Sequence, residues 1–185
     1  MFKVYLAGPE VFLPNAAEVG AAKKRICAAH GLEGLFPLDQ QQPELPPIQL
    51  ATAIYRANAA LMDQADAIIA NLTPFRGAAM DVGTAFEVGY CAARGVKLFG
   101  YANIRALLTE RTAHSAKGGV RVDENGWMVE DFGFFENLMI EVPIREFGGI
   151  VTADAPRDDL LGNLAAFESV VERAARVLTA SRTGS

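Results

Sequence analysis

The chain has 185 residues, of which 51% are hydrophobic and 21% are charged, so its size and composition are those of one compact, soluble domain that needs neither a metal ion nor a disulfide for stability. A net charge of −5 and the lack of a long run of Lys and Arg argue against binding of a nucleic-acid polymer, which leaves small solutes as the better candidate ligands. The sequence contains neither a secretion signal nor an apolar stretch of bilayer length, so we expect a cytoplasmic protein in which Cys27 and Cys91 are free thiols.

Short apolar runs alternate along the chain with longer, Ala-rich stretches of helical character. We predict strands over residues 2–7, 34–37, 67–72, 96–100 and 149–151. We predict helices over residues 15–30, 48–64, 82–94, 134–141 and 157–181. This alternation predicts an α/β fold in which helices flank a five-stranded parallel sheet, of the flavodoxin-like or Rossmann-like kind.

Residues 103–130 interrupt this alternation with a polar, weakly periodic stretch that contains Lys117-Gly118-Gly119 and Asn125-Gly126. The stretch is long for a connection inside a compact domain. We interpret it as an irregular insertion in a single domain over residues 1–185, either a mobile flap or an assembly element.

Ligands of open α/β sheets bind beyond the carboxyl ends of the strands, so the loops after the predicted strands are where functional residues are expected. These loops contain no GxGxxG, GxxxxGK[ST] or GxSxG motif. Dinucleotide binding, P-loop chemistry and a hydrolase nucleophile elbow therefore have no support, and we expect no cofactor.

Glu87 is the one charged residue in the predicted helical segment 82–93. A carboxylate on an otherwise apolar helix must face a cleft, form an ion pair or accept hydrogen bonds, because an isolated buried charge is costly. Gly83 and Thr84, one turn earlier, leave little bulk, so a ligand could approach this carboxylate closely. The alternatives are an ion pair with Arg94 or a hydrogen bond to a neighbouring strand.

Asp81 stands directly before the same helix, where it could cap the helix or pair with Arg76. It could instead share a cleft with Glu87, since two carboxylates beside a glycosidic bond can divide the roles of nucleophile and proton donor. Tyr5, in the first predicted strand, needs a partner for its hydroxyl if it is buried, and Glu87 would suit. Gly8 and Pro9 then form a tight turn that permits close backbone approach.

Three segments together resemble the nucleoside 2-deoxyribosyltransferase family: YLAGP at 5–9, NLTPFRG at 71–77 and DVGTAFEVG at 81–89. The last contains the pattern Asp-x-Gly-x-x-x-Glu-x-Gly after the third predicted strand. The resemblance runs from the first strand to Gly100 and resumes at residues 132–140.

The resemblance implies roles for three residues. The glutamate that matches Glu87 is the nucleophile that forms a covalent deoxyribosyl intermediate, and the tyrosine that matches Tyr5 donates a hydrogen bond to it. The aspartate that matches Asp81 handles the nucleobase and its proton.

The resemblance also implies substrate-binding positions. Asn58 stands where several relatives carry an aspartate. The segment around Asn137, ENLM at 136–139, resembles an element that a neighbouring subunit inserts into the site, so that the asparagine meets the sugar 5′-hydroxyl. The candidate substrate-binding residues are Gly8, Pro9, Phe12, Gln41, Asn58, Gly83, Asn137 and Met139.

We therefore expect a homo-oligomeric enzyme of nucleoside salvage that transfers 2-deoxyribose between nucleobases with retention of configuration. Its substrates would be 2′-deoxyribonucleosides and free bases. Two alternatives remain open. One is a hydrolase of 2′-deoxynucleoside 5′-monophosphates, although Asp81 and Asn137 suit an uncharged sugar hydroxyl better than a phosphate. The other is a non-catalytic nucleotide- or flavin-binding domain, because fold alone does not fix function.

Overall fold

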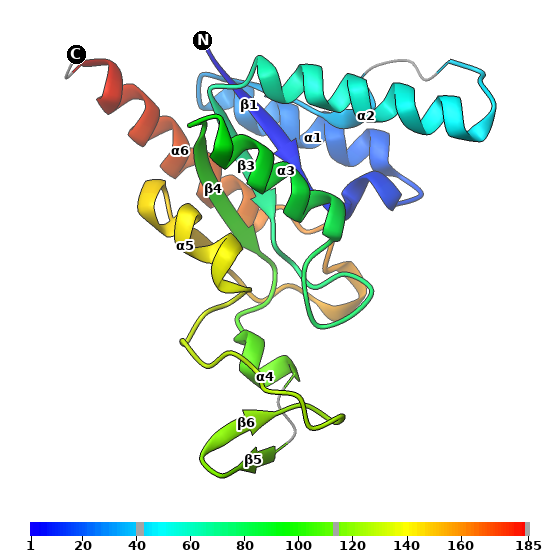
Figure 1. Ribbon diagram of the computed structural model, residues 1–185. Helices are drawn as coiled ribbons and strands as arrows, with labels where there is room; N and C mark the ends of the chain where they lie inside the picture. Colours follow the sequence, from blue (N-terminus) through cyan, green and yellow to red (C-terminus); the bar gives the residue numbers. More distant parts are fainter. Residues whose placement is uncertain (40–42, 113–114, 184–185) are drawn as a thin grey trace.

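The computed structural model describes residues 1–39, 43–112 and 115–183 and shows a parallel sheet with helices on both faces (Figure 1). The strand order is β2-β1-β3-β4-β7, and every neighbouring pair is parallel. The strands are β1 (Phe2–Ala7), β2 (Leu32–Leu35), β3 (Ala67–Asn71), β4 (Lys97–Ala102) and β7 (Ile150–Thr152). The predicted five-stranded α/β fold is confirmed, with the strand order of the flavodoxin-like kind.

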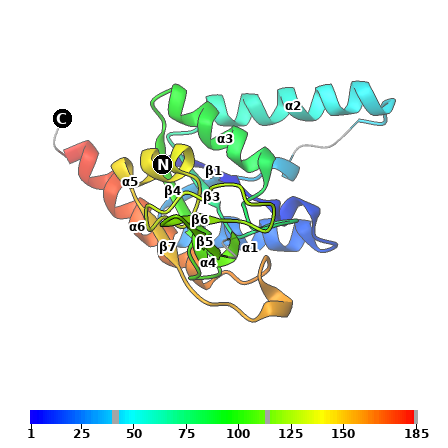
Figure 2. The same ribbon diagram turned by 60° about the horizontal axis from the view of Figure 1, so that its bottom comes forward.

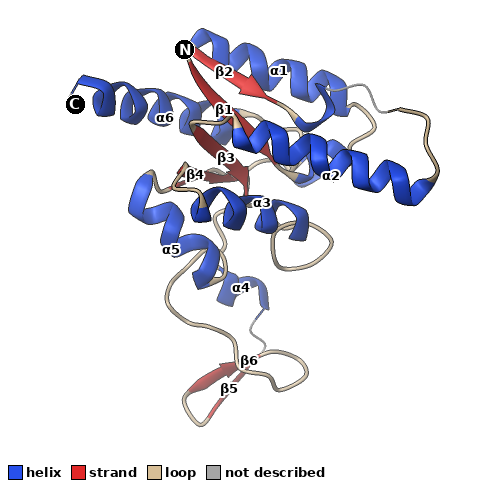
Figure 3. Cartoon of the chain, turned by 45° about the horizontal axis from the view of Figure 1, so that its top comes forward, coloured by secondary structure: helices blue, strands red, loops and turns tan. Residues whose placement is uncertain are grey.

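The helices form two layers, one on each face of the sheet (Figure 3). The helices α1 (Ala16–Ala29) and α6 (Ala165–Thr183) cover one face. The other face is covered by α2 (Pro47–Asp63), α3 (Val82–Ala93) and α5 (Leu138–Phe147).

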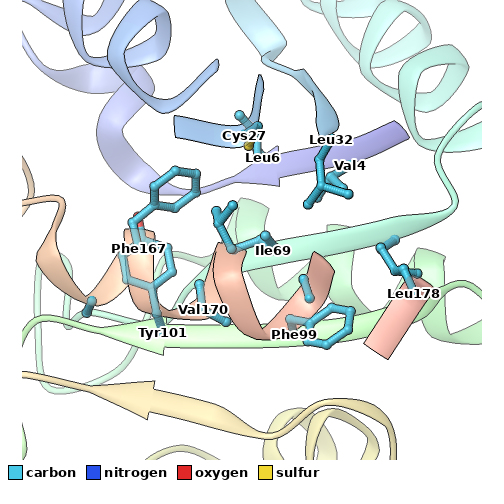
Figure 4. Packing of buried hydrophobic residues seen from close by; sticks show 14 of the residues in the cluster. Val4, Leu6, Cys27, Leu32, Ile69, Phe99, Tyr101, Phe167, Val170 and Leu178 are labelled. Atoms are coloured by element: carbon cyan, nitrogen blue, oxygen red, sulfur yellow. The ribbon is translucent and has the colours of Figure 1, made fainter. Parts of the chain in front are cut away.

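Alternate residues of β1 supply the two halves of the core, as the two-residue period of a strand requires. Val4 and Leu6 pack against the α1 and α6 layer, where Figure 4 shows them with Phe99 and Phe167. Tyr5 points to the opposite face, toward the layer that contains α3. This alternation places the tyrosine hydroxyl on the side of the sheet where Glu87 lies.

The sheet also determines where a ligand can bind. The chain leaves β1 for the edge strand β2 and returns to β3 on the other side of β1. Connections therefore diverge between β1 and β3, which opens a crevice at their carboxyl ends. Two short 3₁₀ helices, η1 (Pro9–Phe12) and η2 (Pro37–Asp39), follow β1 and β2 at this edge.

The predicted helix over 134–141 is wrong in its bounds, because α5 begins only at Leu138. The backbone N–H groups of Phe135 and Glu136 donate to the Glu141 side chain, at 2.6 and 2.8 Å. Asn137 then caps the helix through a bond from the Met139 N–H to its Oδ1.

The predicted helix over 157–181 also begins too early. Its first part is a separate 3₁₀ turn, η3 (Arg157–Asp159), and α6 starts at Ala165. The Asn103 side chain donates to the carbonyls of Leu160 and Asn163, which holds this segment as a loop.

The segment 103–130 contains the short helix α4 (Leu108–Thr112) and the two-stranded hairpin of β5 (Ser115–Lys117) and β6 (Val120–Val122). Gly118 and Gly119 form its turn with φ of 59° and 81°, a conformation that favours glycine. The hairpin projects beyond the carboxyl edge of the sheet (Figures 1 and 2). Across the described residues, we find no helix with the length and apolar character that crossing a membrane requires.

Candidate active site

A cavity of about 290 Å³ opens at the carboxyl ends of β1 and β2, beside the start of α3. Its lining combines residues from the turn after β1, the loop after β2, and helices α2 and α3. Five predicted substrate-binding or catalytic positions besides Glu87 contribute: Gly8, Phe12, Asn58, Asp81 and Gly83.

Glu87 lines this cavity one and a half turns into α3, and Tyr5 contacts it from the sheet. The Tyr5 hydroxyl donates a hydrogen bond of 2.6 Å to Glu87 Oε1. Tyr5 is fully buried, so its ring fixes the donor in place. The bond occupies one carboxylate oxygen and leaves Oε2 for a ligand.

The alternative ion pair between Glu87 and Arg94 does not form. Arg94 instead lies 3.2 Å from Asp63 at the far end of α3. The hydrogen bond to a neighbouring strand, the other alternative, is the one that the structure contains.

The environment of Glu87 raises the pKa of its carboxyl to about 7, mainly because burial disfavours the charged form. The hydrogen bond from Tyr5 acts in the opposite direction, while the nearby charges of Asp81 and Glu10 raise the pKa further. Burial and the adjacent Glu87 raise the pKa of Tyr5, so the phenol keeps its proton and remains a donor. A carboxyl that titrates near neutral pH in a cavity is typical of a functional site.

Asp81 both caps α3 and lines the cavity. Its Oδ2 accepts hydrogen bonds from Thr84, at 2.9 Å from the backbone N–H and 3.2 Å from the hydroxyl. Within the described residues its Oδ1 has no hydrogen-bond partner, and it forms no ion pair with Arg76. The capping role and a role toward a ligand are therefore compatible, since each can use a different oxygen.

The glycines at the cavity are required by space. A Cβ on Gly8 would lie 1.9 Å from Glu10 Oε2 and 2.9 Å from Asn71 Cβ. A Cβ on Gly83 would lie 3.0 Å from Asp81 Oδ2. A side chain at Gly8 would displace these neighbours, whereas one at Gly83 would press on the Asp81 carboxylate.

Phe12 presents a flat apolar surface at the cavity, and 56% of it is exposed. Its ring stacks on Phe75, with 5.4 Å between centroids and 8° between planes. The Arg76 guanidinium lies 5.0 Å and 4.6 Å from the centroids of these two rings. Arg76 has a φ of 54°, in the left-handed region that non-glycine residues adopt uncommonly.

Asn58 reaches the cavity from α2, and its Oδ1 is buried with no hydrogen-bond partner among the described residues. A buried acceptor without a donor costs free energy that a ligand N–H or O–H could recover. The side chain thus offers a place for a ligand donor.

The remaining predicted positions lie elsewhere. Pro9 is buried beside the cavity and begins η1 without lining the space. Asn137 and Met139 are exposed on α5 and do not line the cavity of their own chain. Gln41 lies outside the described residues.

Sequence reasoning did not assign five of the lining residues to the site: Val11, Pro37, Leu38, Ile54 and Thr84. Leu38 could have been predicted to line the site, because its loop follows a strand. Ile54 lies one helical turn before Asn58, on the same face of α2. No three His, Cys, Asp or Glu residues of the described chain are grouped as a metal site.

The fold and the cavity together define an α/β protein in which two carboxylates, Asp81 and Glu87, line a cavity for a small ligand. Residues 4–139 match the family model of nucleoside 2-deoxyribosyltransferase. An uncharacterised protein of Schizosaccharomyces pombe is 36% identical over 170 residues, which are 82% of this chain and 81% of the relative. The chain belongs to the nucleoside 2-deoxyribosyltransferase family, as the resemblance of its motifs indicated.

Solved structures agree with this assignment. A 2-deoxyribosyltransferase of Leishmania mexicana matches with a TM-score of 0.64 and 28% identity, over 93% of this chain and 98% of that one. A conserved protein of Enterococcus faecalis shares the fold, with a TM-score of 0.53 and 16% identity over 95% of this chain and 99% of that one. The matches point to an enzyme of the deoxyribosyltransferase type.

Proposed function

We propose that this protein transfers 2-deoxyribose from one nucleobase to another through a covalent intermediate on Glu87. The observation that carries the proposal is the one carboxylate of α3, which receives a 2.6 Å hydrogen bond from Tyr5 and faces a cavity shared with Asp81. Family membership supplies the sugar and base as substrates.

In the first step, Glu87 Oε2 attacks the anomeric carbon while the bond from that carbon to the base nitrogen breaks. The bonding electron pair stays with the base, which takes a proton from Asp81 and leaves. Tyr5 holds Oε1 so that the attacking oxygen points into the cavity.

In the second step, a nitrogen of the incoming base attacks the anomeric carbon from the face that the first base left. The ester bond to Glu87 breaks, and the proton of the incoming base returns to Asp81. Two inversions give net retention, as in retaining glycosidases.

The other lining residues suit the base. The exposed ring of Phe12 provides a surface for stacking, which is worth about 1–3 kcal/mol per base. The unpartnered Oδ1 of Asn58 can accept a hydrogen bond from a base N–H. We further propose that Asn137 and Met139 complete the sugar site of a neighbouring copy, since both are exposed on their own chain.

The test incubates the protein with 2′-deoxyinosine and free adenine and separates the products by chromatography. Formation of 2′-deoxyadenosine supports transfer. Release of free 2-deoxyribose without exchange would indicate hydrolysis of the nucleoside. Release of 2-deoxyribose 5-phosphate from 2′-deoxyinosine 5′-monophosphate, in a parallel incubation, would indicate the nucleotide hydrolase. No turnover of these substrates or of thymidine would indicate a binding protein.

The covalent step has a separate test. A 2′-deoxy-2′-fluoro nucleoside should label the wild-type protein on Glu87, as mass spectrometry of peptides would show. A folded Glu87→Ala variant should lose both the label and the exchange activity, and sugar found on another residue would remove Glu87 from the nucleophile role.

A further inference from the structure

Glu136 is a buried carboxylate just before α5, with 2% of its surface exposed. Its Oε2 accepts a hydrogen bond of 2.9 Å from the backbone N–H of Met80. Its Oε1 accepts one of 3.0 Å from the N–H of Asn137. One side chain thereby connects two segments that lie 56 residues apart in the sequence.

The surroundings of Glu136 compensate its charge. The Arg111 guanidinium, also buried, lies 3.8 Å from Glu136 Oε2 and stacks over the Phe135 ring at 4.4 Å. Arg111 also donates to the carbonyl of Phe135. A buried carboxylate with a counter-charge and two backbone donors is satisfied, but an apolar side chain would fill this space at lower cost in desolvation.

Glu136 is itself fixed by a second buried carboxylate. Glu141 Oε2 accepts the N–H groups of Phe135 and Glu136, and Glu141 Oε1 lies 2.6 Å from Arg145 Nε. The carboxylate of Glu136 therefore projects from a segment whose backbone is held in place.

Met80, the donor of this bond, directly precedes Asp81 and is itself buried. Its N–H belongs to the Ala79–Met80 peptide, one residue before the cap of α3, where Asp81 accepts a hydrogen bond from Thr84. The hydrogen bond from Met80 to Glu136 thus fixes the chain at the point where it delivers the Asp81 carboxylate to the cavity.

We infer that Glu136 is a positioning residue that acts through the Met80 peptide to orient Asp81 toward the leaving base. The inference rests on the proposed transferase function. Misplacement of a reacting group by about 1 Å can cost about 100-fold in rate, so a lost anchor one residue away should be measurable.

The test uses two donors that differ by one methyl group. 2′-Deoxyguanosine needs a proton on its leaving base, whereas 7-methyl-2′-deoxyguanosine carries a cationic base that leaves without one. The Glu136→Gln side chain has one acceptor oxygen and cannot satisfy both N–H groups. We expect kcat for 2′-deoxyguanosine to fall about 10- to 100-fold, while kcat for the methylated donor stays within about threefold.

Glu130→Gln is the matched control, because Glu130 accepts hydrogen bonds from Asn137 and Leu138 on the same segment and, among the described residues, none from Met80. This variant should leave the ratio of the two donors unchanged. On an Asp81→Asn background, Glu136→Gln should add less than about twofold, since both changes act on one group.

If Glu136→Gln fails to fold, an ester in place of the Ala79–Met80 amide removes the same N–H and keeps every side chain. It should give the same donor dependence. Equal losses for both donors, or additive losses with Asp81→Asn, overturn the inference while the transferase function stands. Wild-type protein that exchanges neither donor overturns the proposed function and the inference with it.

Discussion

Two effects on the pKa of the Glu87 carboxyl oppose each other. Burial raises this pKa, and the hydrogen bond from Tyr5 lowers it. The balance leaves the pKa at about 7. Because only the carboxylate is a nucleophile, kcat/KM should fall about tenfold per pH unit below that midpoint and reach a plateau above it. Initial rates with 7-methyl-2′-deoxyguanosine between pH 5 and pH 8 would measure this. A profile that is flat through pH 6 would contradict it.

Tyr5→Phe tests the effect of the hydrogen bond on the pKa of Glu87. The variant keeps the buried ring and removes the donor to Glu87 Oε1, so the carboxylate loses its stabilising bond and the pKa of Glu87 rises. The midpoint of the pH profile should move upward, and the rate at pH 6.5 should fall about tenfold or more. An unchanged midpoint with a lower plateau would assign Tyr5 to orientation alone.

Glu87→Gln should stabilise the protein at neutral pH. The folded-state pKa of about 7 exceeds the ordinary value of 4.5, so the unfolded chain ionises first and stability falls as pH rises from about 4.5 to 7. The variant lacks this loss, and its free energy of unfolding should exceed that of the wild type by about 1–3 kcal/mol above pH 7. Urea titrations at pH 4.5 and pH 8 would show whether the gain appears only at the higher pH.

At the scale of elements, the sheet could be predicted because most of its strands are local apolar runs between helical stretches. The strand predicted over 34–37 lies two residues too late, because β2 (Leu32–Leu35) includes Glu33 and is not a continuous apolar run. The starts of α5 and α6 could not be predicted, because side chains distant in sequence decide them. The Asn103 side chain donates hydrogen bonds to the carbonyls of Leu160 and Asn163, and the Glu141 carboxylate accepts hydrogen bonds from the N–H groups before α5. A prediction from hydrophobic periodicity assumes that these backbone groups form hydrogen bonds within a helix, so it begins both helices too early.

The same distinction applies to the site. Glu87 and Asp81 could be proposed from the sequence because each contrasts with its immediate neighbours along the chain. The contact between Glu136 and Met80 could not, since the sequence does not reveal that these segments meet. The buried pair of Glu10 and Lys23 could not be predicted either, because the sequence does not reveal that η1 and α1 bring these two side chains together.

That pair provides a prediction about how η1 is held beside the cavity. Lys23 on α1 lies 2.7 Å from Glu10 on η1, both side chains are fully buried, and the Tyr101 hydroxyl donates to the same Glu10 oxygen. Lys23→Met would leave Glu10 buried without its counter-charge and should cost about 3–5 kcal/mol in unfolding free energy. Urea denaturation measures this cost.

The double variant Glu10→Gln/Lys23→Met is the control for lost packing. It removes both charges and should recover part of the stability, because no uncompensated charge remains. A double variant less stable than Lys23→Met alone would show that packing of the lysine stem dominates.

At the scale of the whole molecule, four of the large exposed apolar residues lie close together in the sequence, between Trp127 and Met139. Trp127, Met128, Phe132 and Met139 expose 70%, 76%, 60% and 73% of their surfaces. Large exposed apolar side chains near one another mark an interface more often than a free surface. Asn137 lies in this segment, held by Glu130 and capping α5.

We therefore predict that active sites form between copies of the chain, with Glu87 from one copy and Asn137 from another. Asn137→Ser keeps a capping oxygen but removes the amide donor, so α5 should remain folded. Glu87→Ala and Asn137→Ser should each be nearly inactive alone. After subunit exchange in an equal mixture, about a quarter of the sites should receive both intact residues and recover about that share of the activity. Native mass spectrometry would follow the exchange of subunits. A mixture that stays inactive after complete exchange, or an active species that sediments as a monomer, would return Asn137 to its role as the cap of α5.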